Sequence, residues 1–157
     1  MSPRNSGMRP TGAAYYHLDP EVPGGLGART QLAALPEGPC VRKLHYEFSA
    51  GAQGDDLATS HPAFIISERI GGLLMQEALS GFALADMEQS VDEQAYELNP
   101  TLQLQTFKWL QVTGQAGRDD FGLDGADLVV SERALSVLRQ HAQLSLCDVE
   151  PWAPRVQ

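Results

Sequence analysis

The chain is poor in cysteine and has no long apolar run. Its two cysteines, Cys40 and Cys147, form no CxxC pair, which argues against a structural zinc site and leaves a disulfide between them open. No stretch of about 18 apolar residues is present, so we expect no membrane-spanning helix. Residues 1–12 lack the apolar segment of a secretory signal, and we expect them to form a disordered leader. The expected location is the cytoplasm.

Basic side chains are also scarce. Lys and Arg number 11 against 20 Asp and Glu, which gives a net charge of −9. A protein that binds nucleic acid would present a basic stripe, so this balance argues against that class and suits a basic protein partner instead. A chain of 157 residues buries roughly 70% of its unfolded surface. We therefore expect one α+β domain over residues 13–157 that needs no metal, disulfide or cofactor for stability.

One stretch of sequence occurs twice. Phe64-Ile65-Ile66-Ser67-Glu68-Arg69 returns as Leu128-Val129-Val130-Ser131-Glu132-Arg133, at an offset of 64 residues (131 − 67). Upstream, Asp55-Asp56-Leu57 matches Asp119-Asp120-Phe121 at the same offset. Matches in this order and at this spacing indicate a duplicated structural unit.

The match continues beyond the two helices. After a two-residue deletion, the segment from Leu84 to Glu88 aligns with the segment from Leu146 to Glu150. We therefore interpret residues 40–88 and 104–150 as two copies, each with the order strand, acidic loop, short strand, helix and strand. Because each unit has a one-sided apolar face, we predict that the two pack together with pseudo-two-fold symmetry. The two helices would cover mostly one side of the sheet or sheets.

Local patterns place the elements of each unit. Leu44, Tyr46 and Phe48 lie two apart and form the apolar face of a strand from Val41 to Phe48, whose counterpart runs from Leu104 to Thr113. Ser67 and Ser131 are predicted helix N-caps, because a serine hydroxyl accepts hydrogen bonds from first-turn N–H groups.

Further elements are expected outside these segments. Ser90 and Glu93 have the spacing of a capping box and predict a helix from Val91 to Leu98. Gly81 is expected to end the first repeated helix. The remaining expectations are a short strand at residues 14–18, one helical turn at residues 32–35, and a final strand through Leu144, Leu146 and Val149.

The acidic loops are the first candidate for chemistry. Asp55, Asp56, Asp119 and Asp120, with His61 nearby in sequence, could hold a divalent cation or act as general acid and base. Aspartate is also a common turn residue, because it bonds its own backbone. We favour the structural turn, since the pair is repeated with its unit.

The Ser-Glu-Arg triplet is the second candidate. A serine nucleophile needs a base within reach, and none of the four histidines lies in a catalytic motif such as HExxH. A helix cap is therefore the better interpretation of Ser67 and Ser131. We expect Arg69 and Arg133 to pair with acidic residues across the two copies.

Four aromatic residues form the third candidate. Tyr15, Tyr16, Trp109 and Trp152 are too many to be central core in a domain of this size, and Tyr and Trp are favoured at protein interfaces. Ordinary edge packing is the alternative. We name them with Asp55, Asp56, Asp119 and Asp120 as predicted partner-binding residues, and we predict no catalytic, cofactor-binding or metal residue.

The combination of an apolar pair, Ser-Glu-Arg, a helix and a strand ending in Asp-apolar-Glu resembles the core unit of immunity proteins from bacterial polymorphic toxin systems. It is similar to an immunity-like family with a V-S-E-R helix unit, and to the closing unit of the myxobacterial double-CxxCG proteins. Val129 to Trp152 and Phe64 to Glu88 carry the likeness, which extends over residues 40–152. The chain has no CxxCG, so zinc is not implied.

The resemblance implies a cytoplasmic protein that neutralises a cognate toxin by binding it, and it brings no catalytic residues. An acidic chain would suit a basic nuclease toxin. Two alternatives stay open. The first is a hydrolase or metal-dependent enzyme that uses the duplicated Asp-Asp loops. The second is a homodimer or larger homo-oligomer held by apolar surface.

Overall fold

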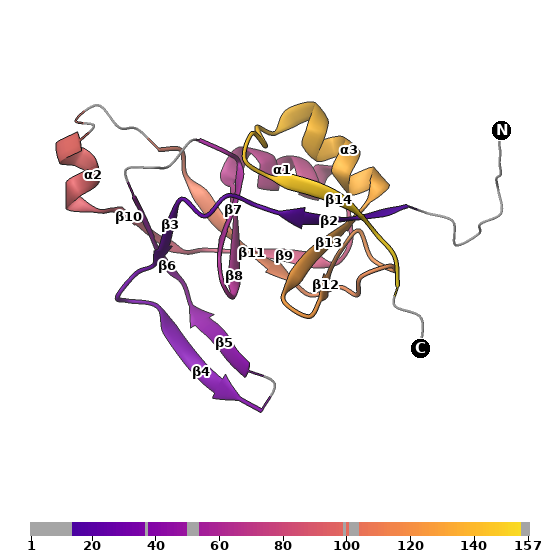
Figure 1. Cartoon of the computed structure of the whole chain (residues 1–157), viewed down its shortest axis with the longest axis horizontal. Helices are drawn as coiled ribbons and strands as arrows, with labels where there is room; N and C mark the ends of the chain where they lie inside the picture. Colours follow the sequence, from indigo (N-terminus) through magenta and orange to yellow (C-terminus); the bar gives the residue numbers. More distant parts are fainter. Residues whose placement is uncertain (1–13, 37, 50–53, 99, 101–103, 155–157) are drawn as a thin grey trace.

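The computed structural model describes residues 14–36, 38–49, 54–98, 100 and 104–154 (Figure 1). The fold is mixed α+β and consists mostly of strands, with three helices in this part of the chain. The expected leader, residues 1–12, lies outside the described residues. No helix among the described residues combines the length and apolar character needed to cross a membrane.

The first four-stranded sheet is antiparallel and has the order β7–β8–β11–β9. A hairpin supplies β7 and β8, helix α1 follows, and β9 returns to the sheet. The strand between β8 and β9 is β11, which comes from later in the chain. The bounds are β7 (Leu57–Ser60), β8 (Ala63–Ser67), α1 (Glu68–Gln76), β9 (Phe82–Ala85) and β11 (Phe107–Val112).

The second four-stranded sheet has the order β12–β13–β2–β14 and is also antiparallel. Again a hairpin is followed by a helix and a returning strand, and again one strand is inserted from elsewhere. Here the inserted strand is β2, from the start of the described chain. The bounds are β2 (Tyr15–Asp19), β12 (Phe121–Asp124), β13 (Asp127–Ser131), α3 (Glu132–His141) and β14 (Asp148–Trp152).

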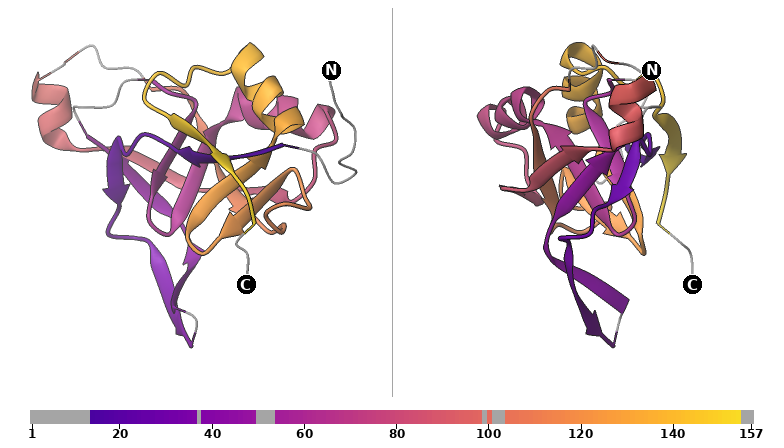
Figure 2. Two further views of the ribbon diagram at one scale, coloured as in Figure 1. Left: turned by 45° about the vertical axis from the view of Figure 1, so that its right-hand side comes forward. Right: turned by 90° about the vertical axis from the view of Figure 1, so that its left-hand side faces the viewer.

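The remaining strands form two smaller sheets. Parallel and antiparallel pairing joins β10, β6 and β3 into a three-stranded sheet, and β4 and β5 form a hairpin of their own. Figures 1 and 2 show this hairpin projecting away from the rest. The bounds are β3 (Gly24–Leu26), β4 (Gln31–Leu35), β5 (Gly38–Lys43), β6 (His45–Phe48), β10 (Glu88–Val91) and α2 (Glu93–Leu98).

Several sequence-based expectations for the units are wrong. Both acidic loops contain a strand, because β7 and β12 pair with the short strands that follow them. The segment from Val41 to Phe48 lies outside the first four-stranded sheet. The third strand in the order of each sheet is β11 in the first sheet and β2 in the second, so β11 corresponds to β2. The turn expected at residues 32–35 is strand β4, and α2 begins at Glu93, after a strand rather than after a capping box.

The alignment of the closing strands also needs correction. Leu84 pairs with Leu110 in the first sheet, and Val149 pairs with Leu18 in the second. Leu110 and Leu18 hold matching positions beside β8 and β13. The sheets therefore match Leu84 with Val149 rather than with Leu146, and β14 starts only at Asp148.

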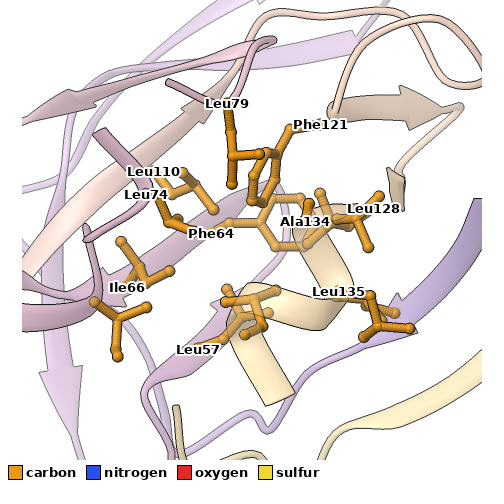
Figure 3. Packing of buried hydrophobic residues seen from close by; sticks show 14 residues of the cluster. Leu57, Phe64, Ile66, Leu74, Leu79, Leu110, Phe121, Leu128, Ala134 and Leu135 are labelled. Carbon is orange, nitrogen blue, oxygen red and sulfur yellow. The ribbon is translucent and has the colours of Figure 1, made fainter. Parts of the chain in front are cut away.

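Two apolar clusters fill the interior. The larger one takes side chains from both four-stranded sheets and from α1 and α3, as Figure 3 shows for Phe64, Phe121 and Leu135. The smaller one lies on the other face of β8, where Ile65 meets Tyr46 and Phe48 of β6. Because β8 is buried on both faces, all five of its residues are buried. The two helices cover one face of this sheet, as expected, and β6 covers the other.

The predicted helix caps are confirmed. The hydroxyl of Ser67 accepts from the N–H of Ile70, and that of Ser131 accepts from the N–H of Ala134. Gly81 does not end α1, which stops at Gln76. Gly81 instead has φ +94° in the turn before β9, where a Cβ atom would lie 2.0 Å from the carbonyl oxygen of Phe121.

Candidate protein-binding surface

The first acidic pair is buried beside the end of the β7–β8 hairpin. The Asp56 carboxylate accepts from four donors, and four is about the number of lone-pair positions that a carboxylate offers. The donors are Ser67 Oγ (2.7 Å), Gln105 Nε2 (2.9 Å), Gln143 N (2.6 Å) and Arg69 Nη2 (3.2 Å).

Asp55 anchors the same stretch of chain. Its carboxylate accepts from the backbone N–H groups of Ser145 at 3.0 Å and Leu146 at 2.7 Å. Asp55 and Asp56 are both buried, and their bonds fix the segment that follows α3. These two residues were predicted to bind a partner, but neither carboxylate is exposed in the structure.

The second acidic pair makes corresponding bonds nearer the surface. Asp120 accepts from Ser131 Oγ at 2.6 Å and from the backbone N–H of Ser80 at 2.9 Å. Asp119 accepts from the backbone N–H of Gln115 at 2.7 Å, which lowers the pKa of its carboxyl below the ordinary value. Ser80 follows α1, so this pair anchors the chain after α1. Asp119 and Asp120 stay partly exposed.

Two arginines extend these anchors to the end of the other helix. Arg69 lies 3.2 Å from Asp56 and Arg133 lies 3.7 Å from Asp120, so each pairs with the aspartate of its own segment rather than across the two. What crosses over is a hydrogen bond to a carbonyl. Arg69 donates to His141 O at the end of α3, and Arg133 donates to Glu77 O at the end of α1.

The structure separates His61 and the two acidic pairs. His61 lies in the turn between β7 and β8, at the opposite end of the hairpin from Asp56. A cavity of about 200 Å³ touches Asp55 and Glu21 but neither Asp119 nor Asp120. Within the described ranges, no three His, Cys, Asp or Glu side chains gather as a metal ion would require.

One contact between a serine and a histidine was not predicted from the sequence. His45 is buried, and its Nε2 lies 2.7 Å from Ser90 Oγ. The backbone N–H of Arg29 donates to Nδ1 at 3.2 Å, which favours the tautomer with the proton on Nε2, and Arg29 Nη2 lies 3.4 Å from Nε2. In that tautomer His45 donates to Ser90 rather than accepting its proton. No local motif signalled it, because Ser90 and His45 are far apart in sequence.

Tyr15 and Trp152 form the aromatic contact of the second sheet. The residues pair across β2 and β14, and their rings meet edge to face with centroids 6.1 Å apart. The indole N–H of Trp152 donates to Asp124 at 2.9 Å. Both aromatic residues are half-buried, so each keeps part of its ring at the surface.

The second acidic pair adjoins this aromatic contact. Burial raises the pKa of the Tyr15 hydroxyl, and the nearby charges of Asp120 and Asp119 raise it further. We call Tyr15, Asp119, Asp120, Asp124 and Trp152 the aromatic–acidic patch. It unites four of the eight predicted partner-binding residues and adds Asp124, whose role the sequence did not indicate.

The other two predicted aromatic residues lie elsewhere. Tyr16 packs against the larger apolar cluster, and Trp109 lies on β11, packed against the smaller one. Both side chains are partly buried at the margin of an apolar cluster, which is the edge packing considered as the alternative for them. No family model, curated protein or solved structure matches the chain, so its function has to be inferred from this surface and its chemistry.

Proposed function

We propose that the chain is a non-enzymatic protein-binding domain of the immunity type, which neutralises a cognate toxin in the cytoplasm by direct contact. The aromatic–acidic patch carries this proposal. Tyr and Trp supply rigid contact area at interfaces, and carboxylates beside them favour a basic partner. The net charge of −9 acts in the same direction, because it attracts such a partner over a distance.

We prefer binding to catalysis, because the carboxylates of Asp55 and Asp56 already accept hydrogen bonds from within the fold. Asp56 accepts four hydrogen bonds and Asp55 two, and all of them hold backbone or side chains of the fold. A metal ion would have to displace these donors, which costs the buried groups their partners. The duplicated loops therefore serve as anchors in this proposal.

We further propose that the fold consists of two copies of one unit related by pseudo-two-fold symmetry. Each unit is a hairpin, a serine-capped helix and a returning strand, with one strand inserted between hairpin and return. The equal strand orders support this proposal. So do the matching bonds from Ser67 to Asp56 and from Ser131 to Asp120, at 2.7 and 2.6 Å. This unit also underlies the resemblance to immunity proteins.

Co-expression with the product of the adjacent coding sequence tests the binding function. If that product is a toxin, we expect the chain to restore growth, and titration calorimetry of the purified pair to show direct binding. Trp152→Ala should weaken the binding at least tenfold, since aromatic anchors dominate interface energies.

Trp109→Ala is the matched control, because it removes the same side chain from the other sheet. It should leave the affinity within about twofold, and circular dichroism should show that both variants are folded. The function is wrong if the wild-type chain neither binds nor protects. The assignment to the patch is wrong if the two substitutions weaken binding equally.

A further inference from the structure

The three-stranded sheet carries a cleft that the proposed function does not use. Its volume is about 360 Å³, within the range of roughly 300–1,000 Å³ that is usual for ligand sites in proteins. Its walls are formed by β3 and the residues that flank it, by the end of β6 from Glu47 to Ser49, and by Asp92 after β10. The cleft shares no residue with the aromatic–acidic patch.

One glycine on β3 keeps this cleft open. A Cβ atom on Gly24 would lie 2.0 Å from Glu47 O, and packing therefore requires glycine there. The same holds for Gly27, whose Cβ atom would lie 2.1 Å from His45 Nδ1. On Gly25, by contrast, a Cβ atom would meet nothing within 4 Å, and the backbone is not left-handed. Neither packing nor conformation requires this glycine, and a larger side chain would enter the cleft that Gly25 lines.

The described lining holds two carboxylates and no basic side chain. Glu47 is exposed, and its carboxylate makes no hydrogen bond or ion pair with the described residues. The Asp92 carboxylate accepts from the N–H of Gln94 at 3.2 Å through Oδ1 alone. Arg29 follows the last residue of the lining, but its charge is balanced by an ion pair with Glu88. The cleft therefore keeps negative charge that a cationic ligand would neutralise.

We propose that this cleft binds a guanidinium group. A carboxylate and a guanidinium pair through two parallel hydrogen bonds, and the exposed carboxylate of Glu47 can supply the acceptors. A guanidinium is planar and more weakly hydrated than an ammonium, so it can lie against the bare backbone of Gly25 and loses less on leaving water. A metal ion would find too few ligands, because no three His, Cys, Asp or Glu side chains gather in the part of the chain that the structure describes.

The first test compares three small probes by titration of the full chain, followed through its backbone amide signals in NMR spectra. Propylguanidinium, which is the arginine side chain alone, should shift the signals of Gly25 and Glu47 with a dissociation constant in the millimolar range, as expected for a fragment of this size. Propylurea keeps the planar group without the charge, and butylammonium keeps the charge without the plane. Each should bind at least about fivefold more weakly, because only the guanidinium combines both properties.

Substitutions then assign the binding to the cleft. Gly25→Leu fills the space and should abolish binding of propylguanidinium. Glu47→Gln removes one charge at equal size and should weaken binding about fivefold, which is the upper end for an exposed ion pair. The matched control is Glu132→Gln, which neutralises an exposed carboxylate outside the cleft and should leave the affinity unchanged. Circular dichroism checks that all three variants are folded.

A guanidinium group can belong to an arginine of a protein partner or to a free small molecule. The peptide acetyl-Gly-Arg-Gly-amide, compared with propylguanidinium, separates these two sources. Tighter binding of the peptide would assign the cleft to an arginine side chain carried by a polypeptide, since the backbone then adds contacts. Equal or weaker binding of the peptide would assign it to a free molecule. Both results support the guanidinium chemistry.

Three results would overturn the proposal. They are the absence of shifts in the cleft with propylguanidinium at up to about 20 mM, equal binding of either control probe, and a folded Gly25→Leu or Glu47→Gln variant that binds like the wild type. None of these measurements involves a toxin. The cleft and the proposed function can therefore fail independently of each other.

Discussion

The two four-stranded sheets carry the same set of bonds at different depths. Asp56 and Asp120 each accept from the serine that caps the next helix and from a backbone N–H after the other helix. The Asp56 side chain is 2% exposed and the Asp120 side chain is 17% exposed. The residues that pair with the two serines differ in the same way, since Phe107 is buried and Tyr15 is half-buried.

The difference follows from what covers each sheet. The first sheet lies between the two apolar clusters, whereas the second contributes to the larger cluster alone. Where both faces are covered, the two aspartates are buried and their carboxylates bond within the fold. In the second sheet, where Val129 and Ser131 are also buried, the same anchor leaves Asp119, Asp120 and Tyr15 partly exposed. The second sheet is therefore the one whose anchor residues reach the surface that we propose for partner binding.

The largest expected effect comes from neutralising the deeper aspartate. Asp56→Asn should lower the free energy of unfolding by about 3 kcal/mol, because buried donors lose a charged acceptor. Asp120→Asn should cost only about 1 kcal/mol, since water replaces part of what is lost. Urea denaturation of both variants measures the difference. Equal losses would show that depth does not distinguish the sheets.

The second prediction extends the comparison to the two free thiols. Cys147 adjoins the second sheet, and burial raises the pKa of its thiol to about 11. Cys40 is exposed on β5 of the β4–β5 hairpin. Near neutral pH, Cys147 should react with iodoacetamide at least tenfold more slowly, because the thiolate is the reacting form. Mass spectrometry of timed samples measures both rates, and equal rates in the folded protein would contradict the prediction.

A smaller effect should appear where α1 and α3 differ. Gly72 is exposed in α1, and a Cβ atom there would meet nothing within 4 Å. Gly72→Ala should therefore stabilise the protein by about 0.5–1 kcal/mol. Gly71→Ala is the matched contrast, because its Cβ would lie 3.0 Å from Leu84 Cδ1, and it should gain less or lose stability. Thermal unfolding measures both, and an equal gain would mean that Leu84 moves freely.

The smallest effect concerns pH. The N–H of Gln115 lowers the pKa of the Asp119 carboxyl in the folded state, so the folded protein holds this proton less readily than the unfolded chain. The resulting stability is present above the unfolded pKa and is lost as pH falls through the folded pKa. Asp119→Asn should reduce the slope of unfolding free energy against pH between about pH 5 and pH 2. An unchanged slope would contradict this assignment.

Local signals in the sequence predicted where α1 and α3 begin. Ser67 and Ser131 cap α1 and α3, because capping depends on residues within one turn of each other. Tyr46 and Phe48 are buried two residues apart on β6, as expected. Leu44 is buried too, but it lies between β5 and β6, so the single strand expected from Val41 to Phe48 is wrong. The aromatic strand expected at residues 14–18 is β2, shifted by one residue.

Pairings between distant segments were not predictable in the same way. The strands β7 and β12 are short and follow polar loops, so their periodicity is too brief to separate them from turns. The insertion of β11 into the first sheet and of β2 into the second depends on packing across the whole chain. Of the candidate site, the sequence supplied Tyr15, Trp152, Asp119 and Asp120, but only the register of β2 and β14 brings the two aromatic residues together.

The place of β2 has a consequence for how the protein is made. Its partner Ser131 in β13 follows Tyr15 by 116 residues (131 − 15). At roughly 5–20 residues per second, β2 leaves the ribosome some 6–23 s before its sheet can close. The other sheet likewise waits for β11. The first sheet can be completed once β11 has been made and the second only after β14, so both sheets are completed late in translation.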